Sequence, residues 1–207
     1  MAHLEVEPKP SRPSWVWLLI VLLVILLAGM LIKKCTADGN SGNADSLSAD
    51  TSKVIAKTTP DWNSVDFNAA TQTDADITDT EIQTRSGGSY TIYVLGENIL
   101  FPTGGNDLSE KGMQKLQLIA DVLNKRFPEA TIGVFGSTDS TGPADENKAL
   151  GAERATVVRN WLADQGKVAA DNISVQSLGE TEPIATNDTK SGRQQNRNVS
   201  IVVFPKQ

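Results

Sequence analysis

One acid and one base stand out in this sequence because a turn and the start of a helical pattern separate them. Asp139 lies in the turn-rich segment 136–142 (GSTDSTG), and Arg154 follows within a helical pattern of apolar residues. A carboxylate accepts hydrogen bonds from an ammonium group, and a guanidinium gives a bidentate contact to a carboxylate. Together they could grip both charges of one amino-acid zwitterion. The competing interpretation is an internal Asp139–Arg154 salt bridge or two unrelated surface charges, which are common and weak.

The composition of the chain offers few residues for catalysis or metal binding. The chain has one His and one Cys, His3 and Cys35, and both precede the segment that carries Asp139. Ser-His-Asp triads, Cys-His pairs and His/Cys metal sites are therefore excluded downstream. Asp145 and Glu146 could form a glycosidase pair with Asp139, but acids in a polar loop are usually solvated, and the alternating oxygen ligands of a calcium loop are missing. We expect no enzymatic activity and no cofactor.

Asp139 and Arg154 lie in the C-terminal half of the chain, where strand and helix patterns alternate. We expect an α+β fold: a two-layer sandwich in βαβαββ order, with a mixed four-stranded sheet and two main helices on one face. The expected elements are strand material at 90–95 and 98–101, a helix capped at Asp107 and stopped by Pro128, a strand at 131–135, a helix ending near Gly166, and strands at 173–178 and 199–203.

An apolar run near the N-terminus predicts a membrane anchor. Residues 15–32 (WVWLLIVLLVILLAGMLI) carry no charge. As a helix they would span roughly 27 Å, about the hydrocarbon thickness of a bilayer. Lys33 and Lys34 end the run. A signal peptide cleaved near Cys35 is the alternative, although the run is long and two lysines before the cleavage site are unfavourable.

Charge excludes one class of partner. Of the 25 acidic and 19 basic residues, two acids and four bases precede residue 35, which leaves a balance of −8 over residues 35–207. An acidic segment repels phosphate backbones, so we expect no nucleic-acid partner. Basic residues flank the apolar run equally, and charge alone therefore leaves its orientation open.

The segment between the apolar run and the folded part predicts a disordered polar tether at 33–88. It is rich in Ser, Thr, Asp, Asn and Gly and shows no sustained period. The exception is 61–67 (DWNSVDF), which carries two aromatic residues. We interpret it either as a docking patch for the folded domain or a partner, or as a local cover for a bare edge of that domain.

An ordered set of residues between about 90 and 205 resembles the OmpA C-terminal-like domain, a family of peptidoglycan-binding modules. The matching residues are Phe101, Gly136, Thr138, Asp139, Gly142, Asn147, Leu150, Arg154, Ala155, Gly179, Glu180, Pro183, Asn187, Gly192, Arg193, Asn196 and Arg197. As an ordered set they are specific, although each alone is weak. The resemblance implies non-covalent binding of the diaminopimelate side chain of the peptidoglycan stem peptide, by a domain that spans residues 89–207.

The resemblance also implies which residues bind the ligand. Asp139 and Arg154 fall on the family's two principal ligand positions, Thr138 and Asn147 match secondary positions, and Arg197 lies in the closing Asn-Arg motif. Four positions depart from the family's pattern: Ser137 replaces His, Pro102 stands where Asp often does, Gly104 lies where a polar ligand side chain is common, and Asn198 replaces a second Arg. These departures predict an altered affinity or an altered preference among stem peptides.

Peptidoglycan binding implies a periplasmic domain, and this fixes the orientation of the anchor. Residues 1–14 would then be cytoplasmic, residues 15–32 a single span of the inner membrane, and the chain a non-enzymatic tether between membrane and cell wall. An ion-conducting stator needs a carboxylate in the membrane, which residues 15–32 lack unless a partner supplies it. A positioning subunit of an envelope or secretion assembly stays open, as does a homodimer or larger complex.

Overall fold

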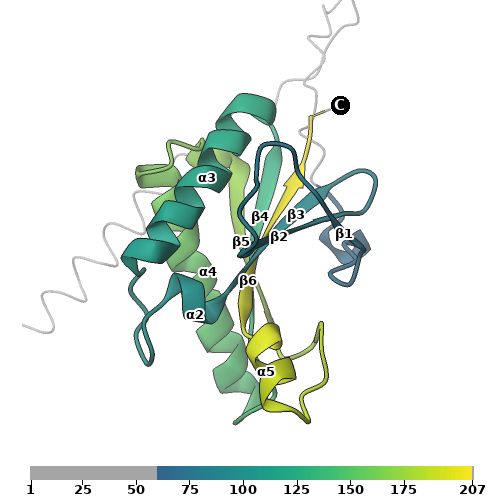
Figure 1. Cartoon of the computed structure of the whole chain (residues 1–207), viewed down its shortest axis with the longest axis vertical. Coiled ribbons are helices and arrows are strands. Elements are labelled where there is room, and N and C mark those ends of the chain that lie inside the picture. The colour runs from purple at the N-terminus through teal and green to yellow at the C-terminus, as the bar shows by residue number, and fades with distance from the viewer. Residues whose placement is uncertain (1–59, 207) are drawn as a thin grey trace, which may run out of the picture. The chain divides into compact units, whose positions relative to one another are not determined.

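The folded part of the protein is a mixed six-stranded sheet with two long helices on one face (Figure 1). The structure is a computed structural model that describes residues 60–206. In spatial order the strands are β1 (Thr71–Gln72), β2 (Ile82–Ser86), β3 (Thr91–Gly96), β6 (Asn198–Phe204), β4 (Thr131–Ser137) and β5 (Ile173–Gly179). Only the β4–β5 pair is parallel among these neighbours. The predicted α+β class with a mixed sheet is confirmed, but the predicted four strands are too few.

The helices in the described part of the chain differ greatly in length. They are α2 (Glu97–Leu100), α3 (Glu110–Arg126), α4 (Ala144–Asp164) and α5 (Lys190–Asn196), with short 3-10 turns η1 (Trp62–Ser64) and η2 (Ala170–Asn172). The predicted strand material at 98–101 is wrong, because this segment forms α2 and its C-cap Phe101. The helix before Pro128 is confirmed, but Ser109 rather than Asp107 caps it, through a 2.9 Å hydrogen bond from the Gly112 amide to the Ser109 hydroxyl.

The main core lies between the sheet and the two long helices. Apolar residues recur along α3 and α4 at helical spacing and pack on side chains of β3, β4 and β6. The fully buried members include Leu116, Ile119, Leu123, Val158, Leu162, Tyr93, Val134 and Ile201. Each such side chain stabilises the fold by about 1.5–3 kcal/mol through burial alone.

The opposite face of the sheet is covered by residues 61–69, which we call the strap. Trp62 and Phe67 contact Phe135 of β4 edge-on, with ring centroids 5.7 and 5.1 Å apart. The Arg85 guanidinium on β2 donates to the carbonyl oxygens of Phe67 and Ala69, at 3.1 and 3.2 Å. The aromatic residues of the strap therefore dock on the folded domain itself, as one of the two interpretations of segment 61–67 proposed.

This docking corrects the predicted boundary of the tether. Residues 60–88, assigned to a disordered segment, include η1, β1 and β2, and they extend the domain that was expected to begin at residue 89. The polar composition of this segment did not indicate a strand, because β2 buries only Ile82 and Thr84, while Gln83 is exposed and Arg85 and Ser86 are half-buried. The predicted anchor at 15–32 and the rest of the tether lie outside the described residues. Within 60–206 no helix has the length and apolarity to cross a bilayer.

Candidate functional site

Asp139 lies in the loop that follows β4, where a turn aims its carboxylate. The Thr141 amide donates to Asp139 Oδ1 at 2.9 Å, and the Thr138 amide donates to the Gly179 carbonyl at 2.8 Å. The loop continues through Gly142, whose φ of 91° is favourable only for glycine. These bonds hold Thr138 and Asp139 side by side at the end of the strand, and both side chains are buried.

Arg154 lies close to this loop because α4 crosses β4 at a pair of glycines. A Cβ atom on Gly136 would lie 1.9 Å from the carbonyl oxygen of Gly151, so only glycine permits this approach. Arg154 follows Gly151 by three residues, on the same helix face. Its residue exposure is only 7%, and its guanidinium lies over the ring of Phe101, 5.8 Å from the centroid.

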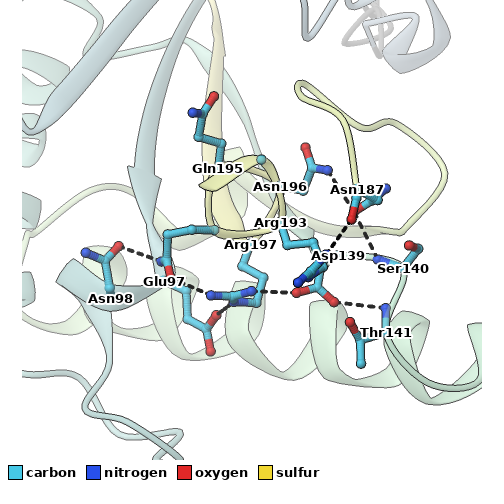
Figure 2. Close-up of polar contacts among 12 residues, drawn as sticks. Glu97, Asn98, Asp139, Ser140, Thr141, Asn187, Arg193, Gln195, Asn196 and Arg197 are labelled. Carbon is cyan, nitrogen blue, oxygen red and sulfur yellow. Dashed lines mark hydrogen bonds and ion pairs between the residues drawn. The ribbon is translucent and has the colours of Figure 1, made fainter. Parts of the chain in front are cut away.

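Two further charges connect Asp139 with Arg154, and together the four form a chain of ion pairs that we call the charge relay. Arg197 Nη1 donates to Asp139 Oδ2 and Arg197 Nε donates to Glu97 Oε2, both at 2.5 Å (Figure 2). The other oxygen of Glu97 accepts from Arg154 Nη2. The relay therefore runs Asp139–Arg197–Glu97–Arg154, with acids and bases in alternation.

Glu97 was not predicted as a site residue. It lies at the junction of β3 and α2, and its backbone amide donates to the Arg197 carbonyl at 2.9 Å. Because β3 pairs with β6 in the register Gly96↔Asn198, the residues next to this pair are brought together. The sequence does show an acid just after a predicted strand. Its contact with Arg197, however, could be inferred only once the pairing of β3 with β6 was known.

Three polar atoms of the site are buried without a hydrogen-bond partner among residues 60–206. They are Nε and Nη1 of Arg154 and Oγ1 of Thr138. An unsatisfied buried donor costs about 1–3 kcal/mol, more for a charged group. Nε and Nη1 of Arg154 and the Thr138 hydroxyl thus lack a partner that an external acceptor could provide.

The ionisation of Asp139 and Arg197 is set by their mutual contact. Burial raises the pKa of Asp139, but hydrogen bonds from Arg197 and Thr141 outweigh this effect, and the net pKa is below its ordinary value. Burial lowers the pKa of Arg197, but Asp139 and Glu97 outweigh it, and the net pKa is raised. Both groups are therefore charged at neutral pH, and the carboxylate retains lone pairs for a ligand ammonium.

The other predicted site residue, Asn147, has a different environment. It is buried in the first turn of α4, and its amide donates to Glu180 Oε2 at 2.6 Å. This bond ties α4 to the loop after β5. Of the five predicted residues, the relay joins Asp139, Arg154 and Arg197, Thr138 adjoins Asp139 in the chain, and Asn147 makes its contact with the neighbouring loop.

A buried asparagine supports the segment that delivers Arg197. Asn196 Oδ1 accepts from the Ile184 and Ala185 amides at 3.0 and 2.9 Å, and its Nδ2 donates to Asn187 Oδ1 at 2.9 Å. Asn187 Oδ1 also accepts from the Ser140 amide at 3.3 Å, as Figure 2 shows. The loop before α5 is thereby linked to the loop of Asp139.

Chemically, the site offers fixed charges and donors. Within residues 60–206 no three His, Cys, Asp or Glu side chains are grouped so that they could hold a metal ion. The arrangement can accept an ammonium at Asp139 and donate to a carboxylate from Arg154 and Thr138.

Comparison with known proteins covers the same region. The sequence model of the OmpA family matches residues 100–197, which include Asp139, Arg154 and Arg197 but not Glu97. Probable lipoprotein YiaD of Escherichia coli is 40% identical over 122 residues, covering 59% of this chain and 54% of YiaD. Peptidoglycan-binding protein ArfA of Mycobacterium tuberculosis is 41% identical over 110 residues, covering 53% of this chain and 33% of ArfA. The chain thus spans about half or less of these two relatives.

A further relative is matched over most of its length, and solved structures share the fold. Putative lipoprotein YfiB of Escherichia coli is 33% identical over 125 residues, covering 58% of this chain and 74% of YfiB. A structure of the periplasmic domain of Helicobacter pylori MotB superposes with a TM-score of 0.58 at 25% identity, covering 67% of this chain and 89% of that one. The cell wall anchor of the T6SS from Pseudomonas aeruginosa gives 0.55 at 25% identity, covering 61% and 89%. The described domain therefore belongs to the OmpA family.

Proposed function

We propose that this protein binds peptidoglycan non-covalently, by gripping the zwitterionic tip of diaminopimelate in the stem peptide. The observation that carries the proposal is the pair of unsatisfied donors on the buried Arg154 guanidinium. In the proposed complex, one of the two unpartnered donors of Arg154, Nε or Nη1, donates to the ligand carboxylate, and Thr138 adds its hydroxyl. Asp139 accepts from the ligand ammonium. Arg197 orients Asp139, and Asn147 holds the neighbouring loop.

The proposed binding uses side chains that contacts within the domain hold in place. Arg154 is clamped by Glu97 and Phe101, and Asp139 by Arg197 and Thr141. Side chains held in one geometry lose little entropy on binding, so more of the interaction energy appears as affinity. A ligand carboxylate would also satisfy donors that are now buried without an acceptor.

Relatives support peptidoglycan as the ligand. ArfA of Mycobacterium tuberculosis is named a peptidoglycan-binding protein, and it matches this chain at 41% identity. The Pseudomonas aeruginosa structure is described as a cell wall anchor, and the Helicobacter pylori MotB domain as periplasmic. We propose that residues 60–206 of this chain likewise bind a cell-wall ligand and lie in the periplasm.

We further propose that the chain links this domain to the inner membrane, with residues 1–14 in the cytoplasm and residues 15–32 as the span. The apolar run in the sequence supports this topology. Because the domain begins near residue 60, the proposed tether shortens to residues 33–59. Fully extended, it would reach on the order of 90 Å. Mass spectrometry of the membrane fraction tests the topology, since a mature chain beginning at Asp38 would contradict a retained anchor.

The binding proposal is tested by co-sedimentation of the full chain, in mild detergent, with purified sacculi. Asp139→Ala and Arg154→Ala should each weaken binding by about 2–5 kcal/mol, because truncation leaves a charge without its partner. Glu129→Ala is the control, since Glu129 is exposed and pairs with Lys206. If both site variants pellet like the parent chain, the ligand site is elsewhere.

A positioning role in a larger envelope assembly is the second candidate. It is favoured by the similarity to the T6SS anchor and to MotB, both at 25% identity. Mild crosslinking followed by purification from membranes separates the two. Recovery of one stoichiometric membrane complex supports the assembly, and recovery of wall fragments alone supports a simple tether.

A further inference from the structure

Glu97 is the one acid of the site that contacts two guanidinium groups. Its Oε1 accepts from Arg154 Nη2, and its Oε2 accepts from Arg197 Nε at 2.5 Å. The side chain is 22% exposed, so these contacts are only partly screened by water. The Arg197 carbonyl accepts from the Glu97 amide, which holds the backbone of Glu97 against the start of β6.

The charges of the relay cancel because of Glu97. Asp139 and Glu97 contribute two negative charges, and Arg154 and Arg197 contribute two positive ones. Without Glu97 the remaining three groups would carry a net positive charge. Such a site would attract any small carboxylate, because two guanidinium groups would then be balanced by one acid only.

We propose that Glu97 is a specificity residue that limits the site to ligands carrying an ammonium and a carboxylate together. The inference rests on the proposed function and adds a requirement to it, which we call the selection rule: the ligand must carry both charges. A zwitterionic tip leaves the cluster neutral, since its ammonium meets Asp139 while its carboxylate meets Arg154. A bare carboxylate would bring a third negative charge beside Glu97, and a bare ammonium a third positive charge beside Arg197. Either excess charge is costly in a partly buried site.

Glu97 also lies outside the stretch that the family's sequence model matches, which begins at residue 100. The selection rule therefore depends on the β3–α2 junction of this chain and on its contact with β6. A purely structural role for Glu97, as a brace for Arg154, would not discriminate between ligands of different charge. Ligand charge is thus the readout that separates the two roles.

The test is calorimetric titration of the full chain, in mild detergent and low salt, with meso-diaminopimelate and with pimelate. Pimelate is the same seven-carbon dicarboxylate without amino groups. The parent chain should bind diaminopimelate and show at least about tenfold weaker binding of pimelate. Glu97→Gln keeps the shape of the side chain and removes its charge. It should gain at least about tenfold in pimelate affinity, and added salt should reverse the gain.

Two other variants complete the experiment. Glu129→Gln removes the same charge far from the site, where Glu129 pairs with Lys206, and should leave both affinities unchanged. Asp139→Asn also makes the relay net positive while leaving the Glu97 contacts in place, and it should likewise gain pimelate binding. It serves as the decisive variant if circular dichroism shows that Glu97→Gln is unfolded.

The two proposals fail in different ways. Absence of diaminopimelate binding by the parent chain would overturn the proposed ligand, whereas the gain of pimelate binding is measured independently of it. If folded Glu97→Gln discriminates between the ligands as the parent does, Glu97 only braces Arg154 and the selection rule is wrong. If Glu97→Gln is unfolded, an Asp139→Asn variant without the gain overturns the rule.

Discussion

Glu97 and Arg154 are 57 residues apart in the chain, yet their side chains form an ion pair at the edge of the core. Glu97 occupies only the Nη2 group of the guanidinium and leaves Nε and Nη1 buried without an acceptor among residues 60–206. The ion pair therefore orients Arg154 and leaves two of its nitrogen atoms free to donate hydrogen bonds to a ligand. This one-sided contact is the basis of the proposed ligand grip.

Arg154→Lys should weaken sacculus binding although the charge is retained. Lysine is a compact point charge and cannot contact Glu97 through one nitrogen while it offers a further donor from a rigid plane, as Arg154 does through Nη2 and its unpartnered nitrogens. We expect binding to fall by about 1.5–3 kcal/mol, the value of a charge-assisted hydrogen bond. Co-sedimentation with sacculi measures it, with a thermal melt to establish folding. Parent-like binding would show that only charge matters at this position.

Thr138→Val should separate stability from binding. The Thr138 hydroxyl is buried without a partner, so its removal should leave the free energy of unfolding unchanged or raise it by about 1 kcal/mol, while sacculus binding weakens. Thr181→Val is the control, because the exposed Thr181 hydroxyl has a partner and donates to the Leu178 carbonyl at 2.7 Å. That variant should lose about 0.5–1.5 kcal/mol of stability and bind normally. Urea unfolding and co-sedimentation provide both readouts.

Gly136→Ala should destabilise the domain at the crossing of β4 and α4. The added Cβ would lie 1.9 Å from the Gly151 carbonyl oxygen, which belongs to the helix backbone and must move with it. Overpacking of this kind costs about 1–3 kcal/mol or more. Chemical denaturation measures the loss, and Ser140→Ala on the exposed loop is the control. An unchanged midpoint for Gly136→Ala would mean that α4 moves away from the sheet at little cost.

Trp62→Ala should test whether the strap is part of the folded domain. The Trp62 ring packs edge-on against Phe135 and Phe204, at 5.7 and 5.5 Å between centroids. Because Trp62 is only partly buried, we expect a loss of about 2–3 kcal/mol, below the range for fully buried aromatic residues. Leu118→Ala, at an exposed position of α3, should cost far less. Faster proteolysis near residue 60 in the Trp62 variant would accompany the loss.

The stability of the domain should fall in acid because of the ion pairs between α3 and residues 76–81. A hydrogen bond from Lys115 lowers the pKa of Asp79, and one from Lys111 lowers the pKa of Glu81. A carboxylate with a lowered pKa in the folded state stabilises the fold above its unfolded pKa, and this contribution is lost as the pH falls through the folded value. Unfolding free energy should therefore hold at neutral pH and decline below the ordinary values of 4.5 for Glu and 3.8 for Asp.

The measurement is the urea midpoint as a function of pH for the parent chain and for Asp79→Asn. The variant lacks one of the titrating carboxylates, so its stability should decline less steeply in acid. A parent curve that rises as the pH falls below 4 would contradict the assignment of these ion pairs.

The local pattern of the sequence predicted much of the helical layer and the loop of the site. Apolar spacing is a local property, and it was enough to identify α3, α4 and the strands β3 to β6. It was not enough for segment 98–101, where strand-forming residue types are overridden by the close packing of α2 against α3 at Gly112. It also missed β1 and β2, because β1 has two exposed residues and β2 buries only two side chains, so both segments look like polar linker.

The residue types alone show which residues carry charge near the end of β4 and on the helix that follows, and they therefore indicated Asp139 and Arg154. The partners of those charges became known from the folded arrangement of the strands. Glu97 and Arg197 are 100 residues apart, and they meet because β3 and β6 pair in one register out of several that the sequence alone allows. Contacts of this kind depend on the pairing of strands that are far apart in the chain, which no local pattern encodes.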